Sequence, residues 1–520
     1  MLLAGSFVFS LSMLAEQPRL VVGIVVDGLR QEVLDLLQSG FSDNGFNRFL
    51  KNGVVIENID FGSNLDAAAS TAVIMSGASP SVNGIGSERI YEPVPRRTVN
   101  IFNDDNVLGN FTDEALSPSS LRVSTISDEA RIAGAGVSYV YSIAANPAMA
   151  LTLASHAGNS AVWFNDKTGN WATSTYFRDT PTAALNANRL HALVNRIDTM
   201  QWKPSPKTAA VSGLPDHLIH YPFRHTFTTK DGDRFLKYAN SPFINQDIST
   251  LAAQYVTGLE LGRHDGTDFL NIAYTLKPFD FSRTSENRYE LYDSYIKLDK
   301  SLSELFTLID NKVGKDNVTY FIVGTPAQNT RRKDDEKWNI PGGEFSSRKA
   351  VSLLNLYLIA IHGNGDWVKG FHNGHFYLNS ELAKNKEIDI SALRRQAADF
   401  LIRMSGVVGS FTIEDIIGAD SGVPNASNRA RNTVLSQSGD VIIDLIPGWT
   451  LIDDFNSALN PSNNISVLAP AVAPFMMSAP GLKPTVISTP VDARAIAPTL
   501  ARVLRIRPPN GAELSPLTLD

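Results

Sequence analysis

The sequence predicts an α/β protein with a doubly wound, mostly parallel β-sheet, helices on both faces and a cap or insertion region. Two observations carry this prediction. Apolar runs of strand length, such as residues 20–27 and 317–323, are typical of strands buried on both faces. Helical patterns separate successive runs, and strands that alternate with helices indicate parallel pairing. We expect one domain over residues 20–517.

The first elements follow directly from these patterns. The apolar run ends at Asp27, and Gly28 makes the turn into a helix expected over residues 30–52, where apolar residues recur on one side. A second strand is expected at 54–59, and a helix of small residues follows Asp66. The next elements are helices at 125–133 and 148–155, and strands at 137–144 and 161–164.

The later elements continue the alternation. An amphipathic helix at 249–263 leads into a buried strand at 268–274. The clearest helix covers 285–313, because Leu291, Leu298 and Leu302 belong to a series spaced by three and four residues. The C-terminal third is expected to hold a hairpin at 367–379, helices at 391–404 and 492–504, and strands at 440–446 and 473–478.

Two segments lack the periodicity of helices and strands. Residues 87–120 are rich in Pro, Asn and Asp, and we expect a loop-rich insertion there. Residues 165–247 are dominated by Thr, Asn, Pro and aromatic residues, with short extended pieces. We expect this second segment to form a cap over the edge of the sheet.

Composition limits the possible functions. The chain has 520 residues, with 43% hydrophobic and 19% charged residues, so it is expected to fold as a globular protein. Its formal net charge of −7, with scattered Lys and Arg, gives no electrostatic case for binding nucleic acid. The chain has no cysteine, which excludes disulfides, thiolate metal sites and a cysteine nucleophile.

The N-terminal segment indicates export. Residues 2–15 form a short apolar run with the length of a signal-peptide core, although no basic residues precede it. We expect residues 1–15 to be a signal peptide and the protein to be periplasmic or otherwise exported; a buried helix is the alternative. No other segment approaches ~18 continuous apolar residues, so no membrane-spanning segment is expected after signal removal.

The stretch from Asn64 to Ile85 carries a family resemblance. Its second half contains Ser76-Gly-Ala-Ser-Pro80, followed by Asn83-Gly-Ile85, and it lies downstream of the strand that ends in Asp27. This pattern resembles the Thr-Gly-x-x-Pro-x-x-His-Gly-Ile-like motif of the alkaline phosphatase superfamily. Within it, the chain is most similar to the bacterial periplasmic phosphatases and the type I phosphodiesterase/nucleotide pyrophosphatase group. Segments such as Trp171-Ala-Thr-Ser-Thr-Tyr-Phe177 extend the resemblance over nearly the whole chain.

The resemblance implies an alkaline-phosphatase-like fold with a two-zinc site. In such a site, zinc activates a Thr or Ser nucleophile and stabilises the leaving oxygen. Three aspartates and three histidines usually hold the two ions. In this chain the nucleophile position falls on Ala67, which has no oxygen to attack with. Only the first ligand is kept, as Asp27.

The other ligand positions have lost their donors. The Asp-x-x-x-His pair falls on Thr275-Leu-Lys-Pro-Phe279, and the Asp-His pair of the next strand falls on Thr325 and Pro326. The last histidine position falls on Val472.

The phosphate-binding positions are changed as well. The Lys-x-Arg of the periplasmic group falls on Asn146 and Ala148, and a helper Asn falls on Glu88. One carboxylate cannot hold zinc, which needs three or four donors, so the sequence predicts no metal and no other cofactor. Asp27 is then expected to be structural, accepting hydrogen bonds from backbone N–H groups.

Other polar residues offer no replacement site. Ser63, Ser70 and Thr71 lie near Ala67, and we interpret them as capping or packing residues. Two sets of histidines, without a metalloprotease motif, are interpreted as surface or structural: His217, His220 and His225, and His372 and His375. For the first set, a fortuitous metal site formed by the three imidazoles remains an alternative interpretation.

The sequence therefore predicts a catalytically inactive protein that acts by binding a protein partner, as a scaffold or subunit of an envelope assembly. One alternative is a metal-dependent phosphoester or sulfate ester hydrolase with a relocated nucleophile such as Ser70 or Thr71. A second is a module that binds an anion or small molecule in the old cleft. Since no Lys or Arg is expected there, an anion would depend on helix N-terminal amides.

Overall fold

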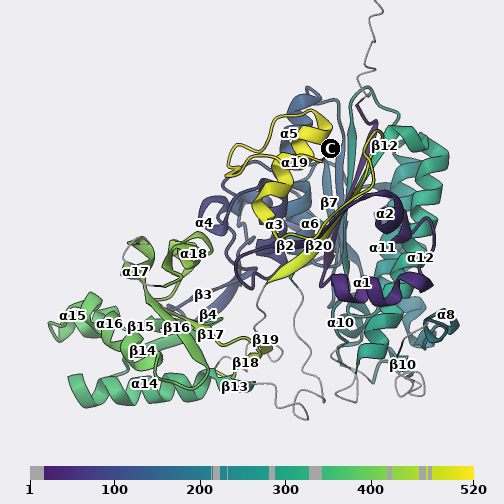
Figure 1. Cartoon of the computed structure of the whole chain (residues 1–520). Coiled ribbons are helices and arrows are strands. Elements are labelled where there is room, and N and C mark those ends of the chain that lie inside the picture. Colours follow the sequence, from purple (N-terminus) through teal and green to yellow (C-terminus); the bar gives the residue numbers. More distant parts are fainter. Residues whose placement is uncertain are drawn as a thin grey trace, which may run out of the picture.

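The computed structural model describes residues 17–211, 214, 223–230, 232–279, 281, 287–326, 342–418, 424–455, 464–466 and 471–519. Figure 1 shows two parts, a larger one around a central sheet and a smaller one that projects from it. The expected signal peptide lies outside the described residues. So do His217 and His220. Among the described residues, no helix has the length and apolar character needed to cross a bilayer.

The central sheet confirms the predicted doubly wound architecture. The strand β1 (Leu20–Asp27) pairs in parallel with both β11 (Asp268–Thr275) and β12 (Val318–Gly324). Beyond β11, the parallel pairing continues through β6 (Val140–Ala144) to β7 (Ser160–Phe164). The C-terminal ends of five neighbouring parallel strands therefore meet at one edge, the usual position of ligand sites in such sheets.

The two ends of the sheet are antiparallel. On one side, β20 (Val472–Ser478) runs antiparallel to β12 and to β2 (Val54–Asp60). On the other, β8 (Trp171–Ser174) pairs antiparallel with β7, and β5 (Gly109–Asn110) follows it. The short strands β21 (Thr485–Ile487) and β22 (Val491–Asp492) both pair with β2.

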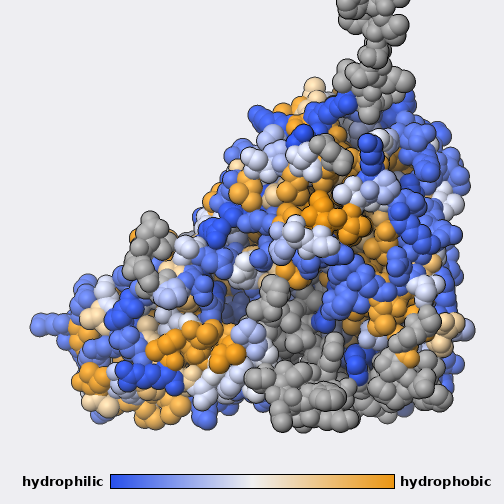
Figure 2. Space-filling model, viewed as in Figure 1, coloured by the Kyte–Doolittle hydropathy of each residue, from blue (hydrophilic) through white to orange (hydrophobic). Residues whose placement is uncertain are grey.

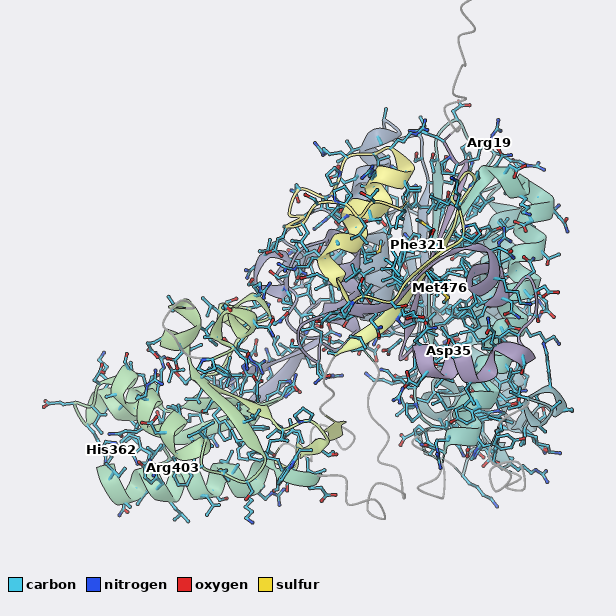
Figure 3. The ribbon with its side chains drawn as sticks, in the orientation of Figure 1. Arg19, Asp35, Phe321, His362, Arg403 and Met476 are labelled. Carbon is cyan, nitrogen blue, oxygen red and sulfur yellow. The ribbon has the colours of Figure 1, made fainter. Side chains whose placement is uncertain are left out.

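Helices cover both faces of the central sheet. Side chains alternate along β1, so Val22 and Ile24 pack into one hydrophobic cluster while Val21 and Val25 pack into the other. One face carries α1 (Gln31–Leu37), α2 (Asn47–Asn52), α11 (Pro242–Gly258) and α12 (Arg288–Val313), and the other carries α3 (Ala67–Ser76), α5 (Ile126–Ala133), α6 (Pro147–Ala154) and α19 (Ile496–Leu504) (Figure 1). Phe321 and Met476, labelled in Figure 3, are fully buried on the adjacent strands β12 and β20.

The smaller part has its own sheet and core. Its sheet has the order β14-β15-β17-β16, and its hydrophobic cluster is separate from the two of the central sheet. The expected hairpin at 367–379 is confirmed. The bounds are β14 (Val368–His372), β15 (His375–Leu378), β16 (Val407–Thr412), β17 (Val441–Leu445), α14 (Ser347–His362) and α16 (Ile390–Leu401). Figure 2 shows apolar residues on the surface of this part. The exposed large apolar residues of α14 are Leu353, Leu356 and Ile361.

The expected continuous helix over 30–52 is wrong. The helix α1 ends at Leu37, a 3-10 turn covers Gln38–Gly40, and α2 starts only at Asn47. The buried carboxylate of Asp299 on α12 holds the intervening loop, accepting from the amides of Ser42 at 2.7 Å and Phe46 at 2.9 Å. Two tertiary hydrogen bonds to Asp299 therefore replace helical ones.

The two insertions hold more regular structure than their composition indicates. Within the segment expected to be loop-rich, residues 89–100 form a hairpin of β3 (Arg89–Glu92) and β4 (Arg97–Asn100). The segment expected as a cap contributes β8 to the central sheet and contains the helices α7 (Thr182–Arg189), α8 (Pro206–Ala209) and α10 (Arg234–Ala239). Trp202 and Phe227 from this segment belong to the main hydrophobic cluster.

Candidate functional site

The helix α3 begins at Ala67, directly after its N-cap Asp66. One oxygen of Asp66 accepts a hydrogen bond from the amide of Ala69 at 2.9 Å, as in other aspartate caps. The second oxygen accepts from the hydroxyl of Ser87 at 2.6 Å and the amide of Glu88 at 2.7 Å. A single carboxylate thus fixes the start of α3 and places Glu88 beside it.

The hydroxyls next to Ala67 are used inside the helix. Thr71 Oγ1 donates to the carbonyl of Ala67 at 2.6 Å, and Ser70 Oγ donates to the carbonyl of Leu65 at 3.3 Å. Both residues are fully buried. Ser63 lies before the helix and lines a separate cavity, described below. These contacts are the ones that packing residues make.

Asp27 is held by two side chains at the end of β1. Thr325 Oγ1 donates to Asp27 Oδ1 at 2.7 Å, and the Nζ of Lys277 lies 2.5 Å from Oδ2. The backbone amides expected from the sequence are therefore not its partners here. The expected position Thr275 lies opposite Asp27 in the parallel register of β1 and β11, which brings Lys277 within reach.

Lys277 remains charged in this position. The negative charge of Asp27 raises the pKa of the Lys277 ammonium against the effect of burial, and Glu88 and Asp66 contribute in the same direction. About 39% of its side chain is accessible. A protein ammonium therefore lies beside Asp27.

Glu88 and Asn146 form the second contact of the site. Asn146 caps α6, its Oδ1 accepting from the amide of Met149 at 3.0 Å, while its Nδ2 donates to Glu88 Oε2 at 2.9 Å. Burial raises the pKa of the Glu88 carboxyl above its usual value. Two positions that the sequence analysis assigned to phosphate binding thus lie together, as an amide and a carboxylate.

A cavity of about 280 Å³ opens at these strand ends. Four of the positions matched to the family's functional residues line this cavity: Asp27, Glu88, Asn146 and Thr275. Lys277 and Arg89 line it as well. The expectation that the cleft contains no Lys or Arg is therefore wrong. Within the described part of the chain, the remaining mapped residues lie outside the lining: Ala67, Ala148, Phe279, Thr325, Pro326 and Val472.

Comparisons with known proteins show which family the chain belongs to. The family described as Type I phosphodiesterase / nucleotide pyrophosphatase matches residues 21–464. The chain belongs to this family. Its fold and its relatives also place it in the alkaline phosphatase superfamily, as the sequence analysis predicted.

Similar curated proteins cover almost the whole chain. "Alkaline phosphatase PhoV" of Synechococcus elongatus is 25% identical, over 95% of this chain and 92% of that protein. "Alkaline phosphatase PafA" of Elizabethkingia meningoseptica is 24% identical, over 96% and 94%. A Myroides odoratus protein named "Calcium-transporting ATPase" is 28% identical, over 97% and 95%. The crystal structure of wild-type PafA superposes with a TM-score of 0.82 at 22% identity, covering 96% of this chain and 98% of that one.

Phe279, at a position where the phosphodiesterase family implies a histidine, belongs to an aromatic cluster. Its ring centroid lies 4.6 Å from that of His225 and 5.0 Å from that of Trp202. The side chain is 1% exposed. The position has therefore become part of the core beneath the cap segment.

The residues present do not fit the zinc pair implied by the family. Asp27 is the one carboxylate at the ligand positions, and its Oδ2 is taken by an ammonium. No three or more His, Asp or Glu residues in the described part of the chain lie together as a metal site would require. The donor set falls short of the three or four ligands that zinc needs.

Three of the histidines interpreted as surface or structural have partners within the chain: His225, His372 and His375. His225 Nε2 lies 3.1 Å from Glu290 Oε1, and His372 Nε2 lies 3.1 Å from the carbonyl of Arg89. His375 Nδ1 accepts from the amide of Gly439 at 3.2 Å. Burial lowers the pKa of His372 and that of His375 to about 3, so both are neutral at ordinary pH.

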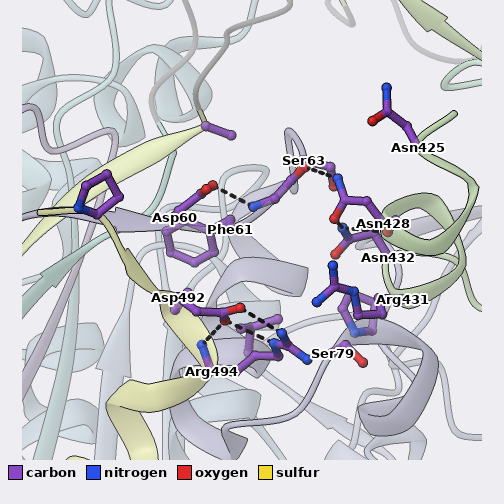
Figure 4. Close-up of a pocket in the computed structure, with 16 residues that line it drawn as sticks. Asp60, Phe61, Ser63, Ser79, Asn425, Asn428, Arg431, Asn432, Asp492 and Arg494 are labelled. Carbon is purple, nitrogen blue, oxygen red and sulfur yellow. Dashed lines mark hydrogen bonds and ion pairs between the residues drawn. The ribbon is translucent and has the colours of Figure 1, made fainter. Parts of the chain in front are cut away.

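A larger cavity of about 490 Å³ lies where α18 (Ala426–Arg431) meets the central part (Figure 4). Ser63 and Ser79 line it, with several asparagines. Its Arg494 is engaged, since Nε and Nη2 lie 2.9 Å and 2.7 Å from the two oxygens of Asp492. This cavity contains none of the mapped catalytic or metal positions.

Sequence reasoning missed Lys277. The residue stands between two mapped ligand positions, Thr275 and Phe279, yet the family pattern assigns no role to it. A charged residue just beyond the end of a buried parallel strand was the available signal, because such ends converge on ligand sites.

Proposed function

We propose that this chain is a catalytically inactive member of the type I phosphodiesterase family that acts by binding, as a scaffold or subunit of a cell-envelope assembly. One observation carries the proposal. The ammonium of Lys277 lies 2.5 Å from Asp27 Oδ2, at the position where active relatives are expected to hold a metal ion. An ammonium neutralises the carboxylate but offers no lone pair or open coordination position to a substrate.

The nucleophile position supports the same proposal. Ala67 has no oxygen, and the neighbouring hydroxyls of Ser70 and Thr71 are fully buried and bonded to backbone carbonyls. A hydroxyl has an ordinary pKa far above neutrality unless a base or metal lowers it. In the described part of the chain, the hydrogen-bond partners of these hydroxyls are backbone carbonyls, and no side chains are grouped as a metal site would require.

The envelope location and the protein partner are supported by two features of the chain. The apolar N-terminal run supports export. A fold that persists without its chemistry is most simply explained by a role in binding another protein. Co-purification from the native envelope, followed by identification of the bound proteins, tests this part.

The hydrolase alternative is tested by turnover. The purified chain is incubated with zinc or magnesium and p-nitrophenyl phosphate, bis-p-nitrophenyl phosphate or p-nitrophenyl sulfate, with Asp27→Ala as the matched control. We expect no turnover above the control. Turnover that Asp27→Ala abolishes, or two equivalents of bound zinc by metal analysis, would overturn the proposal.

Restoring the nucleophile alone is expected to fail. Ala67→Thr supplies a hydroxyl at the start of α3 but no metal to activate it. The variant should show the same background rate as the unchanged chain in the same assays. Measurable zinc-dependent hydrolysis by Ala67→Thr would mean that the site still assembles a metal.

A further inference from the structure

The helix α14 of the smaller part is apolar on two opposite faces. On its inner face, Ala350, Leu354 and Leu358 are fully buried in the hydrophobic cluster of that part. On its outer face, Leu353 is 39% exposed and Leu356 is 61% exposed. A surface helix usually turns polar residues to water, and a helix that is apolar all round is usually covered on all sides. The outer face of α14 therefore lacks the cover that its composition calls for.

The exposed residues of α14 form a stripe along the helix. Four of them follow one another at spacings of four, three and four residues: Lys349, Leu353, Leu356 and Ala360. Such spacings place side chains on one side of a helix. Ile361, which is 48% exposed, adds apolar surface at the C-terminal end. We call these five residues the outer stripe.

Exposed cations flank the outer stripe. Lys349 begins it, and Arg403, labelled in Figure 3, follows the neighbouring helix α16. The rings of Tyr357 on α14 and Phe400 on α16 stack with their centroids 4.5 Å apart, so Arg403 comes three residues after a direct contact between the two helices. Within the described part of the chain, neither Lys349 nor Arg403 is paired with a carboxylate. The sequence of α14 contains no Asp or Glu.

Carboxylates near the two helices have other partners. Asp454 accepts hydrogen bonds from the first turn of α14, and Asp366 Oδ2 lies 2.6 Å from Arg96 Nη2. Asp399, on the exposed side of α16, acts electrostatically on Arg395. The outer stripe thus combines apolar side chains with cations that are available to an anionic surface.

We propose that α14 binds the surface of an anionic lipid bilayer. The outer stripe lies in the headgroup region, where Leu353 and Leu356 contact acyl chains and Lys349 and Arg403 contact lipid phosphates. Helices that lie in a membrane interface combine an apolar stripe with basic residues in this way. A lysine can keep its methylene groups against apolar surface while its ammonium stays in water. The proposal adds a membrane contact to the proposed role in the envelope.

A lipid surface suits the outer stripe better than a protein surface does. A standard protein interface covers about 800 Å² on each partner, whereas even an aromatic side chain supplies about 150–250 Å². The three large apolar side chains of the stripe are each partly buried, so they fall short of such an interface. Figure 1 shows α14 along the rim of the smaller part, where a planar surface can reach it.

Co-sedimentation of the full chain with lipid vesicles tests the proposal. We expect binding to vesicles made of equal parts of phosphatidylglycerol and phosphatidylcholine, and binding about tenfold weaker to phosphatidylcholine alone. Raising the salt concentration from about 0.05 M to about 0.5 M should weaken binding to the anionic vesicles, because exposed charges are screened.

Two double variants separate the apolar and the charged contributions. Leu353→Ser with Leu356→Ser removes apolar side chains, and Lys349→Glu with Arg403→Glu reverses the flanking charges. Each should weaken binding to the anionic vesicles about tenfold. The control is Leu108→Ser, because Leu108 is 72% exposed on the larger part. It should bind as the unchanged chain does, and thermal unfolding verifies that each variant is folded.

The absence of cysteine from the chain allows a direct measurement at the stripe. Leu356→Cys supplies a single thiol for an environment-sensitive fluorophore, and Leu108→Cys supplies the control. Addition of the anionic vesicles should shift the emission to shorter wavelength for the fluorophore at position 356, and leave the emission at position 108 unchanged.

Three results would overturn the proposal: no binding to the anionic vesicles, binding that both double variants retain, or equal emission shifts at the two labelled positions. A dimer in light scattering that Leu353→Ser with Leu356→Ser dissociates would also overturn it, because a second copy would then cover the stripe. Vesicle binding does not depend on catalysis. Failure of the proposed function therefore appears separately, as ester hydrolysis in the turnover assays.

Discussion

The ammonium of Lys277 lies 2.5 Å from Asp27 Oδ2 and links the ends of β11 and β1. Thr325 Oγ1, just beyond β12, donates to the other oxygen of Asp27 at 2.7 Å. Three neighbouring parallel strands are therefore joined at the edge where relatives are expected to hold metal ions.

The Lys277–Asp27 contact should contribute to stability. Lys277→Met leaves the carboxylate of Asp27, whose side chain is 9% accessible, without its counter-ion. Breaking such a pair costs more than the pair itself contributes, and we expect a loss of about 2 kcal/mol in the free energy of unfolding. Urea denaturation measures this loss.

The control for Lys277 is Lys300→Met, because that side chain is 73% accessible and its ion pair is a surface one. It should change the free energy of unfolding little. Combining Lys277→Met with Asp27→Asn should recover part of the loss. A single Lys277→Met variant as stable as the unchanged chain would show that solvent already screens the pair.

Phe279 should behave as a core residue. It is 1% exposed between Trp202 and His225, so Phe279→Ala is expected to cost about 3–5 kcal/mol through lost burial and a cavity. Phe279→Leu should cost less, because it fills more of the same space. Thermal and urea unfolding distinguish the two; equal, small effects from both variants would place Phe279 outside the core.

Glu88 should make stability depend on pH. Burial raises its pKa above the usual 4.5 in the folded state, so stability from the protonated form is complete below that value and is lost as pH rises through the raised pKa. Glu88→Gln removes this loss. The variant should therefore melt at a higher temperature than the unchanged chain at pH 7, and the difference should vanish below pH 4.5.

Melting curves across this pH range check the Glu88 prediction. Glu92→Gln serves as the control, because the Glu92 carboxylate is partly exposed and pairs with Arg97 at 2.7 Å. Its melting temperature should follow that of the unchanged chain at every pH. If the melting temperature of Glu88→Gln still differs from that of the unchanged chain at low pH, the cause is packing and not the charge of Glu88.

Gly23 in β1 permits close packing within the central sheet. A Cβ at this position would lie 2.5 Å from Phe321 Cζ and 2.6 Å from Asn271 Oδ1, both buried. Gly23→Ala should therefore destabilise the chain by about 1–3 kcal/mol through overpacking. Gly258→Ala, at the end of α11, meets no atom within 4 Å and should be neutral or slightly stabilising. Unfolding measurements on the two variants compare their free energies of unfolding with that of the unchanged chain.

The central sheet was predictable because its strands are buried on both faces. Such strands need continuous apolar runs, and β1, β11 and β12 have them. The hairpin at 89–100 was missed, since its polar strands lie near the surface and its pairing depends on few apolar side chains. The break after α1 was missed because Asp299, far along the chain, supplies its hydrogen bonds.

The sequence by itself determined the family, and it predicted that the family's chemical groups are replaced. Ala67, Phe279 and Val472 have no ligand or nucleophile atoms, whatever their surroundings. The partner of Asp27 was decided only by tertiary structure. Lys277 becomes that partner because the parallel register of β1 and β11 brings Asp27 opposite Thr275. Electrostatic pairing depends on distance in space, and the spacing of residues along the chain does not specify it.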